Sequence, residues 1–253
     1  MPQFSSQGVS IHYEVDGDGP PILLIHGFAS NARANWIDTG WVTALTQAGY
    51  RVIVFDHRGH GQSEKLYHSE LYTTSAMAED AVGLLDHLGI RQADVMGYSM
   101  GARVAARLAI DHPERVGRLI LAGLAENMIN GVGGAEDIAK ALEADSLDDV
   151  QDRDARPFRI FADATKSDRK ALAACIRTSR QKIAAEELRR ITAPTLIAVG
   201  SKDHIAGRPE PLQAVIPGSE VLIVPDRDHM RTVGDRRYKA GVIAFLSQAS
   251  ATP

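Results

Sequence analysis

The feature that most constrains the fold is a series of short, unbroken apolar runs separated by stretches with helical spacing. The runs are Ile22–Ile25, Val52–Phe55, Val95–Met96, Leu119–Leu121, Thr195–Val199 and Val221–Val224. The main helical stretches between and after them are Thr74–Leu88, Gly101–Ile110 and Arg237–Leu246. A strand is continuously apolar when both of its faces are covered, as in a parallel sheet. The alternation therefore predicts an α/β fold whose open, mainly parallel sheet has helices on both faces.

One long segment, residues 125–190, departs from this alternation because it contains helical patterns and no convincing strand. Its charge is uneven: residues 136–154 hold eight acids and two bases, whereas residues 156–182 hold eight bases and two acids. Two interpretations follow. The charged residues are solvated helix faces that pair with each other, or the segment is a helical lid whose apolar underside closes a pocket.

Composition excludes several classes of protein. Among 253 residues, 28 basic and 32 acidic side chains give a net charge of −4, which argues against a nucleic-acid-binding surface. Cys175 is the only cysteine, so an intrachain disulfide, a cysteine-based zinc site and an iron–sulfur cluster are excluded. The first ten residues show no secretory signal, and the apolar run 21–25 is too short to span a bilayer. We expect a cytoplasmic protein without a membrane partner.

The strongest chemical motif is Gly97-Tyr98-Ser99-Met100-Gly101, which follows an apolar run and precedes an alanine-rich helical stretch. This is the G-x-S-x-G pattern in the strand–turn–helix context that its mechanism requires. Small residues are needed on both sides of the serine because the turn is tight. The helix that starts beside the serine directs its positive end at any oxyanion forming there. The motif predicts Ser99 as a nucleophile.

A serine hydroxyl is a weak nucleophile unless a base takes its proton and an acid orients that base. Asp203 follows the run Thr195–Val199, and His229 follows the run Val221–Val224. The chain order serine, aspartate, histidine is the one that this mechanism uses on such a sheet. We therefore predict His229 as the base and Asp203 as the acid, with Glu126 as a rival for the acid.

The sequence His26-Gly27-Phe28 ends the run Ile22–Ile25, where a backbone N–H can point into the site. The predicted donors to an oxyanion are the backbone N–H groups of Phe28 and Met100. We expect His26 to support the loop rather than to react.

Two further histidines, His57 and His60, have the spacing H-x-x-H, but no third ligand cluster accompanies them. The nearby Gly59 and Gly61 do not complete a dinucleotide-binding fingerprint. We therefore expect no metal and no cofactor.

A substrate pocket is expected from apolar residues on or near these loops and in the segment 125–190. The predicted lining residues are Trp36, Met128, Phe158, Phe161, Ile205 and Met230. Plain core packing is the alternative for each of them. Such a lining favours a small or medium, largely apolar acyl group.

Taken together, these motifs resemble the α/β-hydrolase fold family. The resemblance rests on His26-Gly27-Phe28, the loop from Asp56 to Ser63, the Gly97–Gly101 turn, Asp203 and His229. It implies an eight-stranded, mostly parallel sheet flanked by helices, with a helical cap inserted after the sixth strand.

Carried over to this chain, the resemblance divides it into a catalytic core of residues 1–124 and 191–253 and a cap of residues 125–190. It gives Ser99, His229 and Asp203 the roles of nucleophile, base and orienting acid. It also places the oxyanion hole at the Phe28 and Met100 N–H groups. One departure is Asp228, because the family often has a small residue before the histidine.

The serine at position 99 discriminates within the family, because the similar haloalkane dehalogenases and epoxide hydrolases have an aspartate there. The resemblance then implies a serine carboxylesterase-like enzyme that cleaves a small-molecule ester through an acyl-enzyme. A lactonase or enol-lactone hydrolase and a cofactor-free perhydrolase remain alternatives with the same triad. A carbon–carbon bond hydrolase is disfavoured because the proline-containing stretch after His-Gly is missing. A non-catalytic ligand-binding protein is disfavoured by the complete triad.

Overall fold

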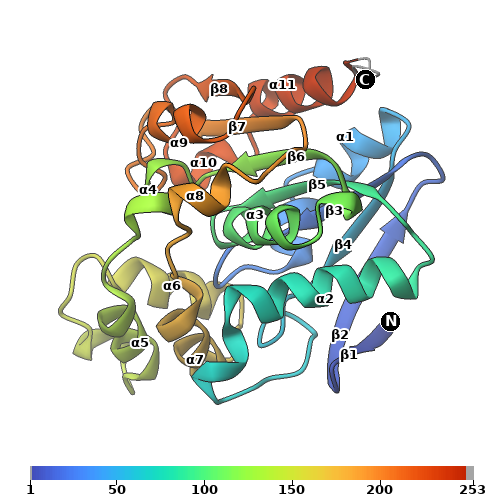
Figure 1. The fold of residues 1–253 in the computed structure, drawn as a ribbon. Coiled ribbons are helices and arrows are strands. Elements are labelled where there is room, and N and C mark those ends of the chain that lie inside the picture. Colours follow the sequence, from blue (N-terminus) through green and yellow to red (C-terminus); the bar gives the residue numbers. More distant parts are fainter. Residues whose placement is uncertain (1, 249–253) are drawn as a thin grey trace.

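A single sheet of eight strands forms the centre of the computed structural model, which describes residues 2–248 (Figure 1). The strand order is β1-β2-β4-β3-β5-β6-β7-β8. The strands are β1 (Gln3–Ser6), β2 (Val9–Asp16), β3 (Pro21–Ile25), β4 (Arg51–Phe55), β5 (Ala93–Tyr98), β6 (Val116–Ala122), β7 (Thr195–Gly200) and β8 (Glu220–Val224). Strand β2 pairs antiparallel with β1 and β4, and every other pairing is parallel. The predicted mostly parallel, eight-stranded sheet is confirmed.

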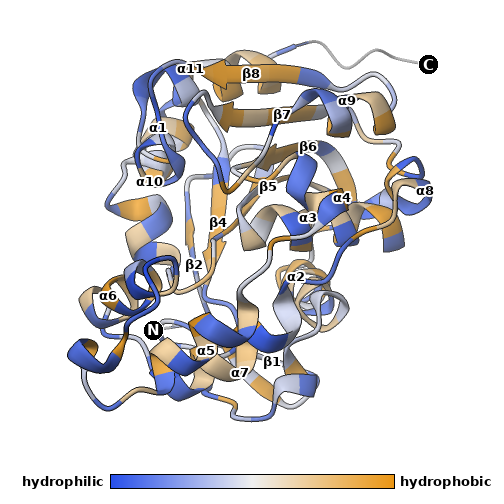
Figure 2. Ribbon diagram, turned by 90° about the vertical axis from the view of Figure 1, so that its left-hand side faces the viewer, coloured by the Kyte–Doolittle hydropathy of each residue, from blue (hydrophilic) through white to orange (hydrophobic). Residues whose placement is uncertain are grey.

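The central strands are apolar throughout because helices cover both sides of the sheet. In β3, Leu23 and Ile25 face one apolar cluster, whereas Ile22 and Leu24 face the other, and all four are fully buried. Successive side chains of a strand point to opposite faces, so a strand between two helical layers needs apolar residues at every position. In Figure 2, β7 and β8 are mainly orange, whereas the helices carry both colours.

Two pairs of helices provide most of this covering. Helices α2 (Thr74–His87) and α3 (Met100–Asp111) pack in one apolar cluster, and α1 (Trp41–Gln47) and α11 (Arg236–Leu246) pack in the other. The shorter helices α9 (Glu210–Val215) and α10 (His229–Thr232) flank β8 in the chain. The helical patterns predicted at 74–88, 101–110 and 237–246 therefore correspond to α2, α3 and α11.

The segment between β6 and β7 contains helices and no strand. It contains α4 (Glu126–Asn130), α5 (Ala135–Glu143), α6 (Arg156–Ala164), α7 (Arg169–Ser179) and α8 (Ala185–Leu188). Helices α5, α6 and α7 share an apolar cluster of their own and lie together at one side of the sheet in Figure 1. The acidic and basic halves of the segment meet where Arg177 pairs with Glu136 at 3.1 Å and with Glu143 at 2.7 Å. The division into core and cap stays a prediction.

None of the helices within residues 2–248 is both long and apolar enough to cross a bilayer. The expected cytoplasmic location is untested by this finding and stays a prediction.

A buried ion pair joins the loop after β4 to helix α2. The Arg58 Nε and Nη2 atoms donate to the two Asp80 carboxylate oxygens, each at 2.8 Å, and Nη1 donates to the Leu71 carbonyl at 2.7 Å. The two charged side chains are 3% and 0% exposed. A buried charge is tolerated when its partner satisfies it with good geometry, as this one does.

The substitution Asp80→Ala should therefore be strongly destabilising, because it leaves the Arg58 charge buried without its partner. We expect the free energy of unfolding to fall by about 3–5 kcal/mol, measured by urea denaturation. Glu186→Ala is the matched control, since Glu186 pairs with Arg189 on the surface and is 80% exposed. It should leave the urea midpoint unchanged. Equal effects of the two substitutions on the free energy of unfolding would contradict the prediction that removing one partner of the buried pair is strongly destabilising.

Candidate active site

Ser99 lies at the sharp turn between β5 and α3. Its φ of 57° is in the left-handed region, which is strained for a residue with a side chain. The glycines two residues away leave room for this turn. A Cβ atom on Gly97 would lie 2.1 Å from the Gly101 carbonyl oxygen, and one on Gly101 would lie 2.0 Å from the Ile25 carbonyl oxygen. Both contacts are with backbone, so neither position has space for a larger residue.

The structure brings Ser99 together with the two other predicted residues. The His229 Nε2 atom lies 3.1 Å from Ser99 Oγ, and the His229 Nδ1 atom lies 2.9 Å from Asp203 Oδ2. Asp203 follows β7, and His229 begins α10 in the segment after β8. The three side chains thus come from the carboxyl ends of three strands, which lie at one edge of a parallel sheet.

Asp203 is held rigidly in its place beside the histidine. Its second oxygen, Oδ1, accepts hydrogen bonds from the backbone N–H groups of Ile205 at 3.0 Å and Ala206 at 2.9 Å. The side chain is fully buried. A carboxylate that is fixed in this way accepts the Nδ1–H of His229 and leaves Nε2 free to accept the Ser99 proton.

Glu126, the rival for the orienting acid, lies elsewhere. Its Oε2 atom accepts hydrogen bonds from Arg208, at 3.3 Å from the backbone N and 3.4 Å from Nε.

Asp228, the residue that departs from the family pattern, has a local role. Its side chain accepts from the backbone N–H of Arg231 at 2.8 Å and so caps the short helix α10, which carries His229.

Phe28 and Met100 both lie beside Ser99, and the N–H groups of both are available. Neither donates a hydrogen bond to another residue within 2–248. Gly27 comes close to Ser99, since a Cβ atom there would lie 3.4 Å from the Ser99 Cβ. The Asn35 Oδ1 atom accepts from the Gly27 N–H at 3.2 Å and holds this loop in place.

His26 is fully buried and supports the same loop. Its Nδ1 contacts the Gly27 carbonyl at 2.7 Å, and its Nε2 accepts from the His57 N–H at 3.0 Å. Burial lowers the pKa of His26, and burial lowers the pKa of His60 to about 3. The His60 Nδ1 atom contacts the Arg58 carbonyl at 3.0 Å. These neutral rings hold backbone groups of neighbouring loops.

A cavity of about 750 Å³ opens above Ser99 and His229. Four of the six predicted lining residues do line it, and these are Phe158, Phe161, Ile205 and Met230. The prediction is corrected for Trp36 and Met128, which are fully buried and pack in the two apolar clusters beside the sheet. Trp36 packs edge-on against Trp41, with ring centroids 6.2 Å apart. Large apolar residues near catalytic loops serve the core as readily as a pocket.

Sequence reasoning missed the polar residues of this cavity, notably Asn35, Arg103 and Arg180. Arg103 is four residues after Ser99 on α3, and this spacing of about one helical turn from the predicted nucleophile was the available signal. Nothing in the sequence pattern distinguishes Arg180 from the other bases of residues 156–182.

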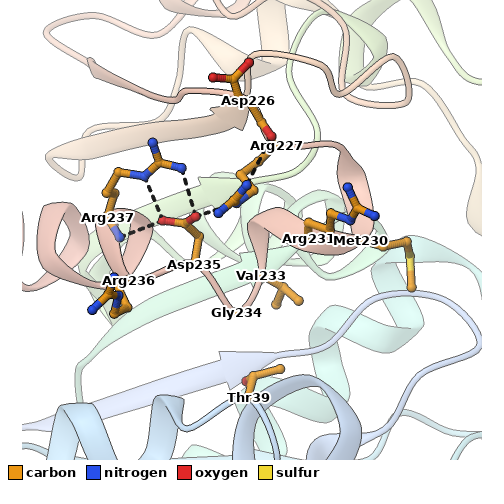
Figure 3. Close-up of a pocket in the computed structure, with 10 residues that line it drawn as sticks. All are labelled: Thr39, Asp226, Arg227, Met230, Arg231, Val233, Gly234, Asp235, Arg236 and Arg237. Atoms are coloured by element: carbon orange, nitrogen blue, oxygen red, sulfur yellow. Dashed lines mark hydrogen bonds and ion pairs between the residues drawn. The ribbon is translucent and has the colours of Figure 1, made fainter.

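A second hollow lies on the surface beside the cavity, and its residues are shown in Figure 3. Asp235 is central to it: its carboxylate pairs with Arg227 at 2.6 Å and with Arg237 at 3.0 Å. The hollow shares Thr39, Met230 and Val233 with the cavity above Ser99. Its lining is mostly charged, and it does not include Ser99 or His229.

Comparison with known proteins identifies the family. Residues 20–155 match the model of the alpha/beta hydrolase fold family, and this match spans more than half of the chain. The protein therefore belongs to the alpha/beta hydrolase fold family.

Individual relatives have diverse activities. The chain is 39% identical to 2-hydroxymuconate semialdehyde hydrolase of Pseudomonas sp. (strain CF600), over 47% of this chain and 41% of that protein. It is 38% identical to epoxide hydrolase B of Mycobacterium tuberculosis, over 43% of this chain and 31% of that protein. The match thus spans less than half of either relative. The structure also resembles the enol-lactonase of Burkholderia xenovorans, with a TM-score of 0.82, 23% identity and coverage of 98% and 100% of the two chains.

The close backbone contacts at the turn predict that Gly101→Ala is damaging. The added Cβ forces the start of α3 away from β3, so we expect a loss of about 1–3 kcal/mol in the free energy of unfolding. Gly133→Ala is the control, because a Cβ there meets no atom within 4 Å. Thermal unfolding of both variants measures the difference, and a fully stable Gly101→Ala protein would contradict the geometry.

Proposed function

We propose that the protein is a serine hydrolase that cleaves a carboxylic ester through an acyl-enzyme. The observation that carries the proposal is the continuous chain of contacts from Ser99 to His229 to Asp203, at 3.1 and 2.9 Å, beneath a largely apolar cavity. A serine in this arrangement supports an acyl-enzyme rather than the alkyl-ester intermediate of an aspartate nucleophile.

The first half of the proposed reaction forms the acyl-enzyme. Ser99 Oγ attacks the ester carbonyl carbon while His229 Nε2 takes the hydroxyl proton. The carbonyl oxygen becomes an oxyanion, and the N–H groups of Phe28 and Met100 stabilise it. When the tetrahedral intermediate collapses, His229 gives its proton to the leaving alkoxide, and the alcohol departs.

The second half returns the enzyme to its starting state. His229 takes a proton from water, and the resulting hydroxide attacks the acyl carbon. The tetrahedral intermediate collapses, and His229 returns the proton to Ser99 Oγ, so that a carboxylic acid is released. Throughout, Asp203 keeps the Nδ1–H of His229 in place and stabilises the positive ring. No metal or cofactor takes part in this scheme.

We further propose that residues 125–190 act as a cap over the site. Phe158 and Phe161 of α6 line the same cavity as Ser99 and His229. Phe28 of the core lies 6.2 Å from Phe158, measured between ring centroids. Because both units contribute to the cavity wall, the segment sets the shape of the space that is open to the acyl or alcohol group.

Removal of the nucleophile tests the proposal directly. We expect Ser99→Ala to lower kcat by about 10⁶-fold on p-nitrophenyl esters of graded acyl length, because the acyl-enzyme no longer forms. A fluorophosphonate probe should label the wild type and fail to label Ser99→Ala. Ser201→Ala is the matched control, since Ser201 lies on the surface, where its Oγ accepts from the Asp226 N–H. Near-full activity of Ser99→Ala would refute the assignment. A lactone belongs in the panel because the same chemistry opens a cyclic ester.

The identity of the orienting acid has its own test. Asp203→Asn should lower kcat by about 10⁴-fold, because the amide favours the wrong tautomer of His229. Glu126→Gln should retain wild-type kcat, since Glu126 contacts Arg208 and not the histidine. The same ester assay measures both variants. The reverse pattern would transfer the role to Glu126.

A further inference from the structure

Arg103 is a buried charge in the cavity wall, and no carboxylate pairs with it within residues 2–248. It is only 3% exposed and lies on α3, one helical turn after Ser99. Its Nη1 atom donates to the Ser179 carbonyl at 2.9 Å, at the end of α7. Its Nε and Nη2 atoms have no hydrogen-bond partner within residues 2–248. A buried guanidinium with an empty edge is costly, so it calls for a specific explanation.

The other buried arginines of this chain are paired. Arg58 uses its Nε and Nη2 atoms to bind both oxygens of Asp80, and Arg159 pairs with Asp163 at 2.9 Å. The edge that is empty in Arg103 is therefore the same edge with which Arg58 binds a carboxylate. That edge matches the two oxygens of a carboxylate in a bidentate arrangement.

Arg180 adds a second positive charge to the same cavity. Its guanidinium lies 5.4 Å from the centre of the Phe158 ring, and Nη1 donates to the Gly133 carbonyl. No carboxylate pairs with it in the described part of the chain. Burial lowers the pKa of both Arg103 and Arg180 to about 10, and for Arg103 the nearby Arg180 charge adds to this effect, so both stay charged at neutral pH.

The remaining charged groups of the lining do not cancel the positive charge of Arg103 and Arg180. Arg153 and Asp154 also line the cavity, but both are exposed and oppose each other in sign. Tyr98 and His229 complete the set of titratable lining residues, and burial raises the pKa of Tyr98, so its phenol carries no charge at neutral pH. The cavity is thus apolar over most of its wall and positive at one place, where Arg103 and Arg180 lie.

On the basis of the proposed ester hydrolysis, we propose that the natural substrate carries a carboxylate group that binds Arg103 and Arg180. A helix rises about 1.5 Å per residue, so Arg103 starts only about 6 Å along α3 from Ser99. The carboxylate therefore lies a few carbon atoms from the scissile ester. The apolar wall holds the carbon chain between them.

A purely structural role is the alternative, since the Nη1 bond to Ser179 links α3 to α7. That bond explains why an arginine reaches this place. It leaves the Nε and Nη2 edge unexplained, because one donor is enough for one carbonyl. The experiment therefore needs a readout that a structural clamp would not move.

The test compares matched ester pairs that differ by one carboxylate. p-Nitrophenyl hydrogen adipate is compared with p-nitrophenyl hexanoate, and 4-carboxyphenyl acetate with phenyl acetate. The first pair places the charge on the acyl side and the second on the alcohol side. After correction for reactivity toward hydroxide, the wild type should prefer one of the two acid esters by about tenfold in kcat/KM.

The variants then assign the preference to the arginines. Arg103→Met should reduce the kcat/KM preference for the acid ester to about one. Arg103→Lys should keep part of this preference, and Arg180→Met should reduce it by about threefold. Arg107→Met is the control, because Arg107 lies one turn further along α3 and pairs with Glu187 at 2.9 Å. It should keep the wild-type preference. If Arg103→Met does not fold, the proposal is tested by whether Arg180→Met reduces the preference for the acid ester.

Several results would overturn the proposal. These are a wild type without preference for either acid ester, a preference that survives both methionine variants, or equal loss on acid and neutral esters in Arg103→Met. Failure of the ester-hydrolase proposal is a different result, namely that no ester is turned over and no phosphonate labels Ser99. In that event, calorimetric binding of adipate to wild type and Arg103→Met still tests the carboxylate site. Equal affinities would refute it.

Discussion

The crossing of β5 and α3 beside the end of β3 is the constraint on which the site depends. Gly97 and Gly101 let the backbone pass within contact distance of its neighbours, and Ser99 takes a left-handed conformation as a result. At such a turn the strained conformation projects the hydroxyl out of the sheet edge, and the proposed oxyanion donor Met100 follows directly. A strained turn persists only when the surrounding structure holds it in place. Here the surrounding structure is a sheet whose apolar strands are covered on both faces.

The architecture and the three catalytic candidates were accessible from the sequence, because both depend on local rules. Unbroken apolar runs required a sheet covered on both sides, and the residues that follow such runs share one edge of it. Ser99, Asp203 and His229 each follow a run, so their approach to one another is a consequence of topology. The short strand β1 (Gln3–Ser6) is not predictable in the same way, because four residues with two serines carry little periodicity.

The cavity was only partly predictable, since its lining depends on how the segment 125–190 packs. Trp36 and Phe158 are both large apolar residues near functional loops, yet one faces the core and the other faces the cavity. The difference depends on where α6 lies, because Phe158 belongs to that helix and Trp36 does not. Arg103 shows the same limit for charge: its sequence position was visible, but the empty edge depends on what Ser179 and Arg180 bring near it from another part of the chain.

The contact between Cys175 and Met100 limits how freely parts of this molecule can be exchanged. The Cys175 thiol of α7 is fully buried and lies 3.9 Å from the Met100 sulfur, directly behind a proposed oxyanion donor. If α7 were replaced by the corresponding helix of a relative, position 175 would need a side chain of a size similar to cysteine. Without one, Met100, which follows Ser99, loses its packing. An exchange of α7 therefore has to preserve the contact of position 175 with Met100.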